Sequence, residues 1–222
     1  MSTVSRPKAI IFDMDGLIFD TEALYREALV DIADERKLTA IDAELIASTI
    51  GTPWHTSRAR FSHALGPRFD VDGLRRQWIA RFDDLAATRM ATKPGVTELL
   101  ELLEQEGIGC GVATGSSRAT AIRHLEAHGL FQRFEVVIAS EDCLLGKPEP
   151  EPFLRAAAAL KVDPGRCWAL EDSANGVRSA WAAGMGVIMV PDLVAPTAEI
   201  RALCDHVITT LHSVPALLAA AQ

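Results

Sequence analysis

The chain has 222 residues, of which 49% are hydrophobic, so it is long and apolar enough to form one large domain or a core with a smaller partner domain. Its formal net charge of −8 argues against a nucleic-acid or anionic-membrane surface, because both need a net basic face. The first apolar run comes too early for a signal peptide, and no apolar run approaches the roughly 20 residues of a membrane span. We therefore expect a cytoplasmic protein without nucleic-acid or membrane partners. The sequence does not determine the oligomeric state, and a monomer or weak oligomer is compatible with it.

The short apolar run at residues 8–12 is the first of a series that alternates with segments of helical periodicity. Near-continuous apolarity of this length is typical of strands buried on both faces of a sheet. The intervening helical segments suit right-handed crossovers between parallel strands. The sequence therefore predicts an α/β fold with a doubly wound, Rossmann-like parallel sheet. Its expected strands are residues 8–12, 108–113, 134–139, 167–170 and 186–190, with a further edge strand within 206–211.

Residues 21–90 are the exception, because this long stretch contains no convincing strand. Its apolar residues recur at helical spacing throughout. Breaks near Gly51 and Leu65 divide it into four expected helices. We expect a discontinuous core domain of residues 1–20 and 91–222, with an inserted helical-bundle domain at 21–90.

Polar side chains directly follow several of the expected strands. Ligands of a doubly wound sheet bind at the carboxyl ends of its strands, so these separate loops are expected to meet at one place. The residues concerned are Asp13 and Asp15; Thr114, Gly115 and Ser116; Lys147, after a longer loop; and Glu171 with Asp172.

Closely packed carboxylates repel one another and raise each other's pKa values unless a cation shares the site. Oxygen ligands without histidine or cysteine favour a hard ion, and Mg²⁺ suits a few carboxylates together with a substrate phosphate. Lys147, Thr114 and Ser116 are then expected to bind the remaining oxygens of a phosphoryl group. Backbone amides of the helix that starts near Ser117 are expected to assist them.

Asp13 and Asp15 can divide a phosphoryl transfer between them. One carboxylate attacks phosphorus to form an aspartyl-phosphate, while the other, two residues away, protonates the leaving oxygen and later activates water. Gly16 permits the sharp backbone turn that follows.

Other cofactor chemistries find little support in the sequence. The four cysteines and six histidines are scattered, without the spacing of a zinc site or a dithiol motif, so buried free thiols are expected. The glycines of GIGCGVATG precede the expected strand or lie inside it, and they lack the G-x-G-x-x-G spacing of a dinucleotide site. A nicotinamide enzyme is a weak alternative.

Four segments in chain order, DMDGLIFDT, TGSS, GKPEPEPF and EDSANG, resemble the four motifs of the haloacid dehalogenase (HAD) superfamily. The similarity is to the subfamily of phosphatases and β-phosphoglucomutase-like proteins, in which a helical cap is inserted after the first motif. The resemblance covers nearly the whole chain. It implies Asp13 as nucleophile, Asp15 as general acid/base and Lys147 as the group that balances charge between Asp13 and the phosphoryl group.

The same resemblance implies a Mg²⁺ site and a phosphate-binding group. Asp13, the main-chain carbonyl of Asp15 and Asp172 would bind the metal, with Glu171 as a ligand directly or through water. Thr114 would bind the transferring phosphoryl group. The further candidates for substrate or phosphate binding are Gly115, Ser116 and Arg118.

Several residues allow two interpretations. Ser116 is a substrate contact or a helix cap, and Arg118 is a substrate contact or a solvated surface charge. Tyr25 and Trp54 belong to expected cap helices, where core packing is the usual role of an aromatic side chain and substrate contact is the alternative. The last pair, Asp20 and Thr21, matches the first motif and is expected to set the hinge or cap a helix.

The preferred interpretation is a Mg²⁺-dependent phosphatase that hydrolyses a small phosphorylated metabolite, a sugar phosphate or a nucleotide-like monoester, under a closing cap. The sequence does not determine which metabolite is the substrate, because the motifs contact the phosphoryl group and not the leaving group. A dehalogenase is disfavoured, since by resemblance it would not need Asp15 as an acid. The alternatives are a hexose-phosphate mutase of the β-phosphoglucomutase type and a non-catalytic phosphate- or metal-binding regulatory module.

The mutases that this chain resembles carry a histidine in the first cap helix, where Tyr25 stands here. They also place basic residues around the cap-loop glycine, whereas Ile50 and Trp54 flank Gly51 in this sequence. A second phosphate group is best bound by charge-assisted hydrogen bonds, and a neutral loop cannot donate them. Two arginines further along the chain, Arg58 and Arg60, are the alternative groups for binding a second phosphate.

Overall fold

The computed structural model describes residues 5–49, 52 and 54–221. The chain divides into two compact units, Met1–Phe19 with Thr92–Gln222, and Asp20–Ala91. We call them the sheet unit and the helical unit. The helical unit extends one residue beyond the expected segment, residues 21–90, at each end.

The sheet unit contains one parallel sheet of six strands in the order β3-β2-β1-β4-β5-β6. The predicted α/β fold with a doubly wound parallel sheet is therefore confirmed. The central strand β1 pairs with β2 on one side and β4 on the other. The strands are β1 Ala9–Phe12, β2 Gly109–Ala113, β3 Val136–Ile138, β4 Cys167–Glu171, β5 Gly186–Met189 and β6 His206–Val207.

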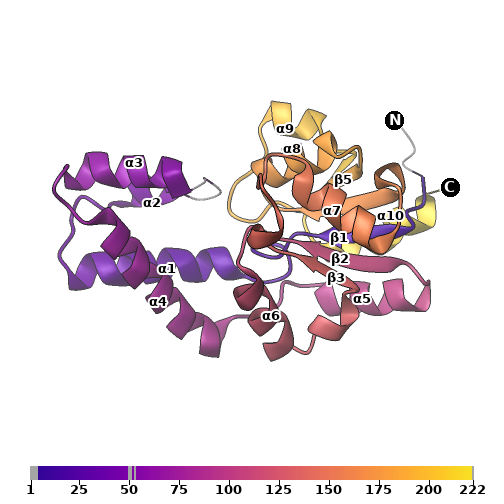
Figure 1. The fold of residues 1–222 in the computed structure, drawn as a ribbon, viewed down its shortest axis with the longest axis horizontal. Coiled ribbons are helices and arrows are strands. Elements are labelled where there is room, and N and C mark those ends of the chain that lie inside the picture. The colour runs from indigo at the N-terminus through magenta and orange to yellow at the C-terminus, as the bar shows by residue number, and fades with distance from the viewer. Residues whose placement is uncertain (1–4, 50–51, 53, 222) are drawn as a thin grey trace. The chain divides into compact units, whose positions relative to one another are not determined.

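Helices cover both faces of this sheet. Helix α7 packs on β1, β2 and β3 and α8 on β4 and β5, while α5 packs on β2 and α6 on β3. Figure 1 shows α7 and α8 on one side of the strands and α5 and α6 on the other. The α-helices are α5 Val96–Gln105, α6 Arg118–Ala127, α7 Glu151–Leu160, α8 Ala174–Ala182, α9 Ala198–Ala202 and α10 Val214–Ala220. The 3₁₀ helices are η1 Phe131–Arg133, η2 Ser140–Asp142, η3 Pro164–Arg166 and η4 Leu211–Ser213.

The core of the sheet unit follows from the apolar strands and from one apolar stripe on each helix. Every residue of β1 is buried, as expected for a strand covered on both faces. In α5 the buried residues are Val96, Leu99, Leu100 and Leu103, the spacing of a single helical face.

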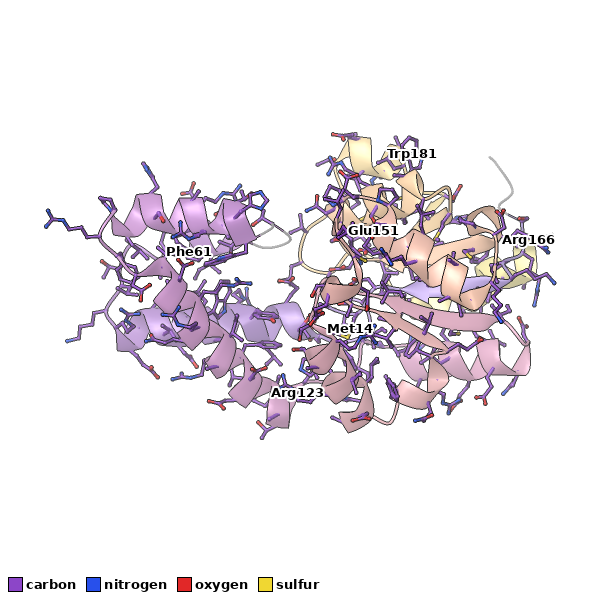
Figure 2. All side chains as sticks on the ribbon, viewed as in Figure 1. Met14, Phe61, Arg123, Glu151, Arg166 and Trp181 are labelled. Atoms are coloured by element: carbon purple, nitrogen blue, oxygen red, sulfur yellow. The ribbon has the colours of Figure 1, made fainter. Side chains whose placement is uncertain are left out.

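The helical unit contains the four expected helices and has hydrophobic cores of its own. One core gathers around Leu29, Phe61 and Leu74, and Phe61 is labelled in Figure 2. A smaller cluster includes Leu24 and Phe82. The helices are α1 Thr21–Glu35, α2 Ala43–Thr49, α3 Trp54–Leu65 and α4 Val71–Arg89. The expected break at Gly51 lies outside the described residues.

Several details differ from the sequence interpretation, and every strand except β4 is shorter than expected. Strand β4 is one residue longer than expected, so Glu171 is its last, fully buried residue and not the first residue of a loop. Asp20 precedes α1 but makes no side-chain capping hydrogen bond. Of the four cysteines, only Cys110 and Cys167 are buried, while the other two are partly exposed. Burial raises the pKa of the Cys110 thiol to about 12.

None of the helices within the described ranges combines the length and the apolar character that crossing a bilayer requires.

The core of the helical unit predicts a contrast between two positions of α4. Leu74 is 1% exposed in the core and Ile79 is 38% exposed on the surface. We expect Leu74→Ala to lower the free energy of unfolding by about 2–5 kcal/mol, because it removes buried methyl groups and leaves a cavity. Ile79→Ala, the control, should cost only a small fraction of this. Urea denaturation followed by circular dichroism measures both, and equal costs would contradict the assigned core.

Candidate active site

The parallel register brings the predicted site residues together at one edge of the sheet. Phe12, the last residue of β1, is paired with Val112 of β2 and Leu170 of β4, so these strands end side by side. Asp13 continues this pattern, because its backbone N–H donates to the carbonyl of Leu170 at 2.9 Å. The chain segments after β1, β2 and β4 therefore start from neighbouring points.

Lys147 connects two of these segments. Its ammonium Nζ lies 2.5 Å from Asp13 Oδ1 and 2.5 Å from Glu171 Oε1. All three side chains are largely or completely buried. A buried charge is expensive unless it is paired, so the ammonium and the two carboxylates stabilise one another.

Burial and the neighbouring charges shift the pKa values of Asp13 and Lys147. Burial raises the pKa of Asp13 to about 8, the Lys147 charge lowers it, and the charges of Glu171 and Asp15 act in the same direction as burial. Burial alone would lower the pKa of Lys147, but the charges of Asp13 and Glu171 raise it above its ordinary value. Lys147 is therefore an ammonium ion at neutral pH.

The second oxygen of Glu171 is held by the start of α8. Oε2 accepts hydrogen bonds from the backbone N–H groups of Asp172 and Ser173, each at 3.1 Å, and from Ser173 Oγ at 3.0 Å. Ser173 is not among the site residues expected from the sequence. The sequence does contain a signal for it, because a serine directly before a helix is a typical N-cap, and Ser173 caps α8.

Asp15 is bound by the loop after β2. Its Oδ2 accepts a hydrogen bond from Ser116 Oγ at 2.7 Å and a longer one from Thr114 Oγ1 at 3.4 Å. Thr114 Oγ1 in turn accepts one from the backbone N–H of Ser116 at 3.0 Å. Gly115, between them, is exposed, and a side chain there would meet open space. Ser116 thus contacts Asp15, and Ser117 is the residue that caps α6.

Three carboxylates form a candidate metal site. Asp13, Glu171 and Asp172 can each offer one oxygen, and these atoms lie within 4.8 Å of one another. The donor set contains only oxygen, which suits a hard divalent cation such as Mg²⁺. The carboxyl groups of Asp15 and Asp172 lie close to those paired with Lys147, and such a concentration of acidic groups favours a bound cation.

Gly16 lets the loop after β1 pass close to Asp172. Its φ angle is +85°, a conformation that glycine adopts readily and other residues rarely do. A Cβ at this position would lie 2.3 Å from Asp172 Oδ2. The sequence predicts a sharp turn at Gly16, and the structure adds this close approach to Asp172.

Arg118 does not join the carboxylate cluster. Its guanidinium donates to the carbonyl of Val137 at 3.1 Å and forms an ion pair with Asp142. Its backbone N–H, at the start of α6, donates to Glu141 Oε2 at 3.0 Å. This end of α6 therefore binds a carboxylate of its own chain, whereas the sequence suggested that it would face a phosphoryl group.

The two aromatic candidates are half-buried and pack against other rings of the helical unit. The Tyr25 ring stacks on Phe82 with 3.6 Å between centroids and meets the edge of Trp78. Trp54 lies near Phe61 and under the guanidinium of Arg75, 4.6 Å from the ring centroid. The contacts of both residues fit the core-packing interpretation.

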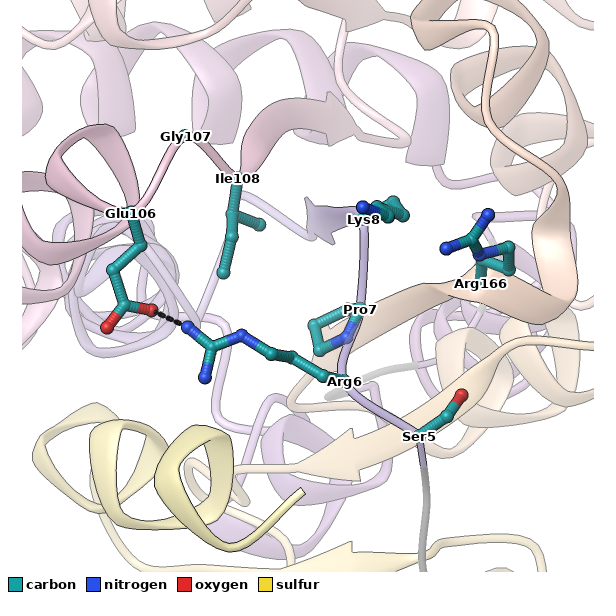
Figure 3. A pocket seen from close by; sticks show the side chains of 8 residues that line it. All are labelled: Ser5, Arg6, Pro7, Lys8, Glu106, Gly107, Ile108 and Arg166. Carbon is teal, nitrogen blue, oxygen red and sulfur yellow. Dashed lines mark hydrogen bonds and ion pairs between the residues drawn. The ribbon is translucent and has the colours of Figure 1, made fainter. Parts of the chain in front are cut away.

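A separate pocket of about 360 Å³ lies where β1, β2 and β4 begin, at the edge of the sheet opposite to the carboxylates. One of its arginines, Arg6, forms an ion pair with Glu106, with 2.5 Å between Nη2 and Oε2. Figure 3 shows this contact among the residues that line the pocket. None of the predicted site residues lines this pocket. Its lining residues are Ser5, Arg6, Pro7, Lys8, Glu106, Gly107, Ile108 and Arg166.

A model of the haloacid dehalogenase-like hydrolases matches residues 10–190 of the chain. The chain belongs to this family. Hexitol phosphatase B of Escherichia coli (strain K12) is 32% identical to this hydrolase over 90% of the chain and 89% of its own length. Phosphorylated carbohydrates phosphatase of Thermotoga maritima is 29% identical over 80% of this chain and 82% of its own.

A solved structure shares the fold of this hydrolase closely. CbbY from Rhodobacter sphaeroides, determined in complex with phosphate, superposes with a TM-score of 0.72 and 27% sequence identity. The match covers 96% of this chain and 99% of that one. The predicted family and the predicted enzyme class, a phosphoric monoester hydrolase, are confirmed by these matches.

Proposed function

We propose that this hydrolase cleaves the phosphate monoester of a small phosphorylated metabolite through an aspartyl-phosphate on Asp13. The observation that carries the proposal is the surroundings of Asp13. Its carboxylate lies 2.5 Å from the Lys147 ammonium, and oxygens of Asp13, Glu171 and Asp172 gather within 4.8 Å of one another. A nucleophile with positive charge beside it and metal-binding oxygens around it is what attack on an anionic phosphoryl group requires.

In the first step, a carboxylate oxygen of Asp13 attacks phosphorus and the bond from phosphorus to the leaving oxygen breaks. The protonated carboxyl group of Asp15 gives its proton to that oxygen, so the leaving group departs as an alcohol. Ser116 Oγ, at 2.7 Å from Asp15 Oδ2, orients this carboxyl group. Lys147 balances the negative charge on Asp13 and on the phosphoryl oxygens.

In the second step, the Asp15 carboxylate takes a proton from water as the water oxygen attacks phosphorus. The bond from phosphorus to the Asp13 oxygen breaks, and inorganic phosphate and the free Asp13 carboxylate are formed. Asp15 ends the step protonated, as it began the first. The two carboxylates thus return to their starting states after one hydrolysis.

The residues present fit a bound Mg²⁺ ion. Asp13 and Asp172 would hold it with their carboxylates and Asp15 with its main-chain carbonyl. Glu171 already binds Lys147 with one oxygen and the segment before α8 with the other. When bound, the ion supplies positive charge that offsets the charge of the phosphoryl oxygens.

A sugar phosphate or polyol phosphate is the proposed substrate class, with a nucleotide-like monoester as the second choice. The support is the names of the relatives, hexitol phosphatase B and phosphorylated carbohydrates phosphatase. The phosphoryl-binding residues do not distinguish these classes, because they contact the transferred group alone.

Hydrolysis is favoured over a mutase reaction by the arginines of α3. Arg58 forms a bidentate ion pair with Asp72, with contacts of 2.9–3.2 Å, and Arg60 donates to the carbonyl of Ser48. Both guanidinium groups are therefore engaged within the helical unit and do not supply a free grip for a second phosphate. The flanking Ile50 and Gly51 lie outside the described residues.

The nucleophile is tested by Asp13→Asn. The amide is close in shape to the carboxylate but is a poor nucleophile, so turnover of p-nitrophenyl phosphate should fall by at least about three orders of magnitude. The circular dichroism spectrum should be unchanged. Asp84→Asn, on the exposed face of α4, is the control and should keep full activity. An unchanged rate in folded Asp13→Asn would refute the assignment.

The metal site is tested by Asp172→Ala. Loss of a ligand carboxylate should weaken Mg²⁺ binding by at least about tenfold. Isothermal titration with Mg²⁺ measures this without substrate, and Asp84→Ala provides the control. Turnover by the unchanged protein should also stop in EDTA and return when Mg²⁺ is added. Activity that persists without any divalent ion would show that no metal is needed.

The fate of the phosphoryl group separates hydrolase from mutase. With β-glucose 1-phosphate and catalytic glucose 1,6-bisphosphate, or with a better substrate from a phosphometabolite panel, we expect inorganic phosphate as the main product. The reason is that no free arginine on α3 holds a bisphosphate for reorientation, so water takes the phosphoryl group from Asp13. Coupled assays for phosphate and glucose 6-phosphate measure both products. Efficient formation of glucose 6-phosphate with little phosphate released would establish the mutase.

A further inference from the structure

Gly176, the third residue of α8, has no room for a side chain. A Cβ at this position would lie 1.8 Å from Glu171 Cδ, 1.9 Å from Oε1 and 2.1 Å from Oε2. Non-bonded atoms do not approach this closely. The Glu171 carboxylate therefore occupies the space in which any other residue at position 176 would place its side chain.

The backbone gives no other reason for a glycine here. Gly176 lies within α8 and is not among the residues with positive φ, so alanine could adopt the same conformation. Glycine inside a helix is less favourable than alanine, because it loses more conformational freedom on folding. The close approach of Glu171 therefore explains the glycine at position 176.

A second contact joins the same two residues through Ser173. The backbone N–H of Gly176 donates to Ser173 Oγ at 3.1 Å, and Ser173 Oγ donates to Glu171 Oε2 at 3.0 Å. Glu171 Oε1 faces the other way and accepts from Lys147 Nζ at 2.5 Å. The carboxylate is therefore held between the first turn of α8 and the lysine.

We propose that Gly176 is a positioning residue for Lys147: its missing side chain provides the space for the Glu171 carboxylate, which holds the Lys147 ammonium beside Asp13. The importance of this position for turnover rests on the proposed function. The packing itself does not, since it follows from the contacts of Gly176, Glu171 and Lys147 alone. A side chain at position 176 displaces Glu171, and Lys147 then loses one of its two carboxylate partners.

A double-mutant cycle on thermal stability tests the packing without substrate or metal. Gly176→Ala should lower the Tm by several degrees in the natural background. In the Glu171→Ala background the same change should leave the Tm equal or higher, because the new Cβ enters the space vacated by the carboxylate. Gly146→Ala is the matched control: its Cβ would meet nothing within 4 Å, so the Tm should not fall.

The lysine is observed directly by NMR. A buried, hydrogen-bonded ammonium exchanges its protons slowly, so we expect a ¹H–¹⁵N signal of Lys147 Nζ in the unchanged protein, assigned by its absence in Lys147→Gln. This signal should be lost or shifted in Gly176→Ala, while the backbone amide spectrum remains that of a folded protein. Turnover of p-nitrophenyl phosphate should fall on the order of a hundredfold in kcat, as for misplacement of a catalytic group.

Each outcome decides the proposal. An equal loss of Tm in both backgrounds, or an unchanged Lys147 signal in Gly176→Ala, would overturn it. If Gly176→Ala is too unstable to purify, a folded double variant supports the proposal and an unfolded one contradicts it. Failure of the hydrolase assignment would appear separately, as full activity of Asp13→Asn, and would leave the stability cycle unaffected.

Discussion

The ion pair network of Lys147 is the interaction on which the site depends. Its ammonium lies between the buried carboxylates of Asp13 and Glu171, at 2.5 Å from each. Two carboxylates so close together would repel one another without it, and removal of one partner from a buried pair leaves an uncompensated charge. One ammonium does not balance two carboxylates, however. The remaining negative charge favours the Mg²⁺ ion that we propose for this site.

The parallel sheet makes this network possible. In a parallel sheet all strands end at the same edge, so residues that follow β1, β2 and β4 are neighbours in space although they are far apart in the chain. The central position of β1 places Asp13 between the other two loops. The pocket bounded by Arg6 and Arg166 lies at the opposite edge and shares none of these groups.

The two units differ in what their side chains contribute. The sheet unit contains every side chain that the proposed hydrolysis uses, together with its own hydrophobic core. The helical unit has separate cores, and its aromatic candidates Tyr25 and Trp54 take part in their packing. All side chains of the proposed phosphoryl transfer thus belong to the sheet unit.

The sequence by itself determined the order of strands and helices along the chain, because burial on both faces leaves continuous apolar runs and helices leave a 3.6-residue period. It also identified Asp13, Lys147 and Asp172 as residues that meet, since polar residues at strand ends share an edge. Only the tertiary structure decided that Arg118 turns to Asp142, and that Glu171 lies against Gly176. Such contacts depend on the distance between side chains from separate elements, which no local pattern in the sequence records.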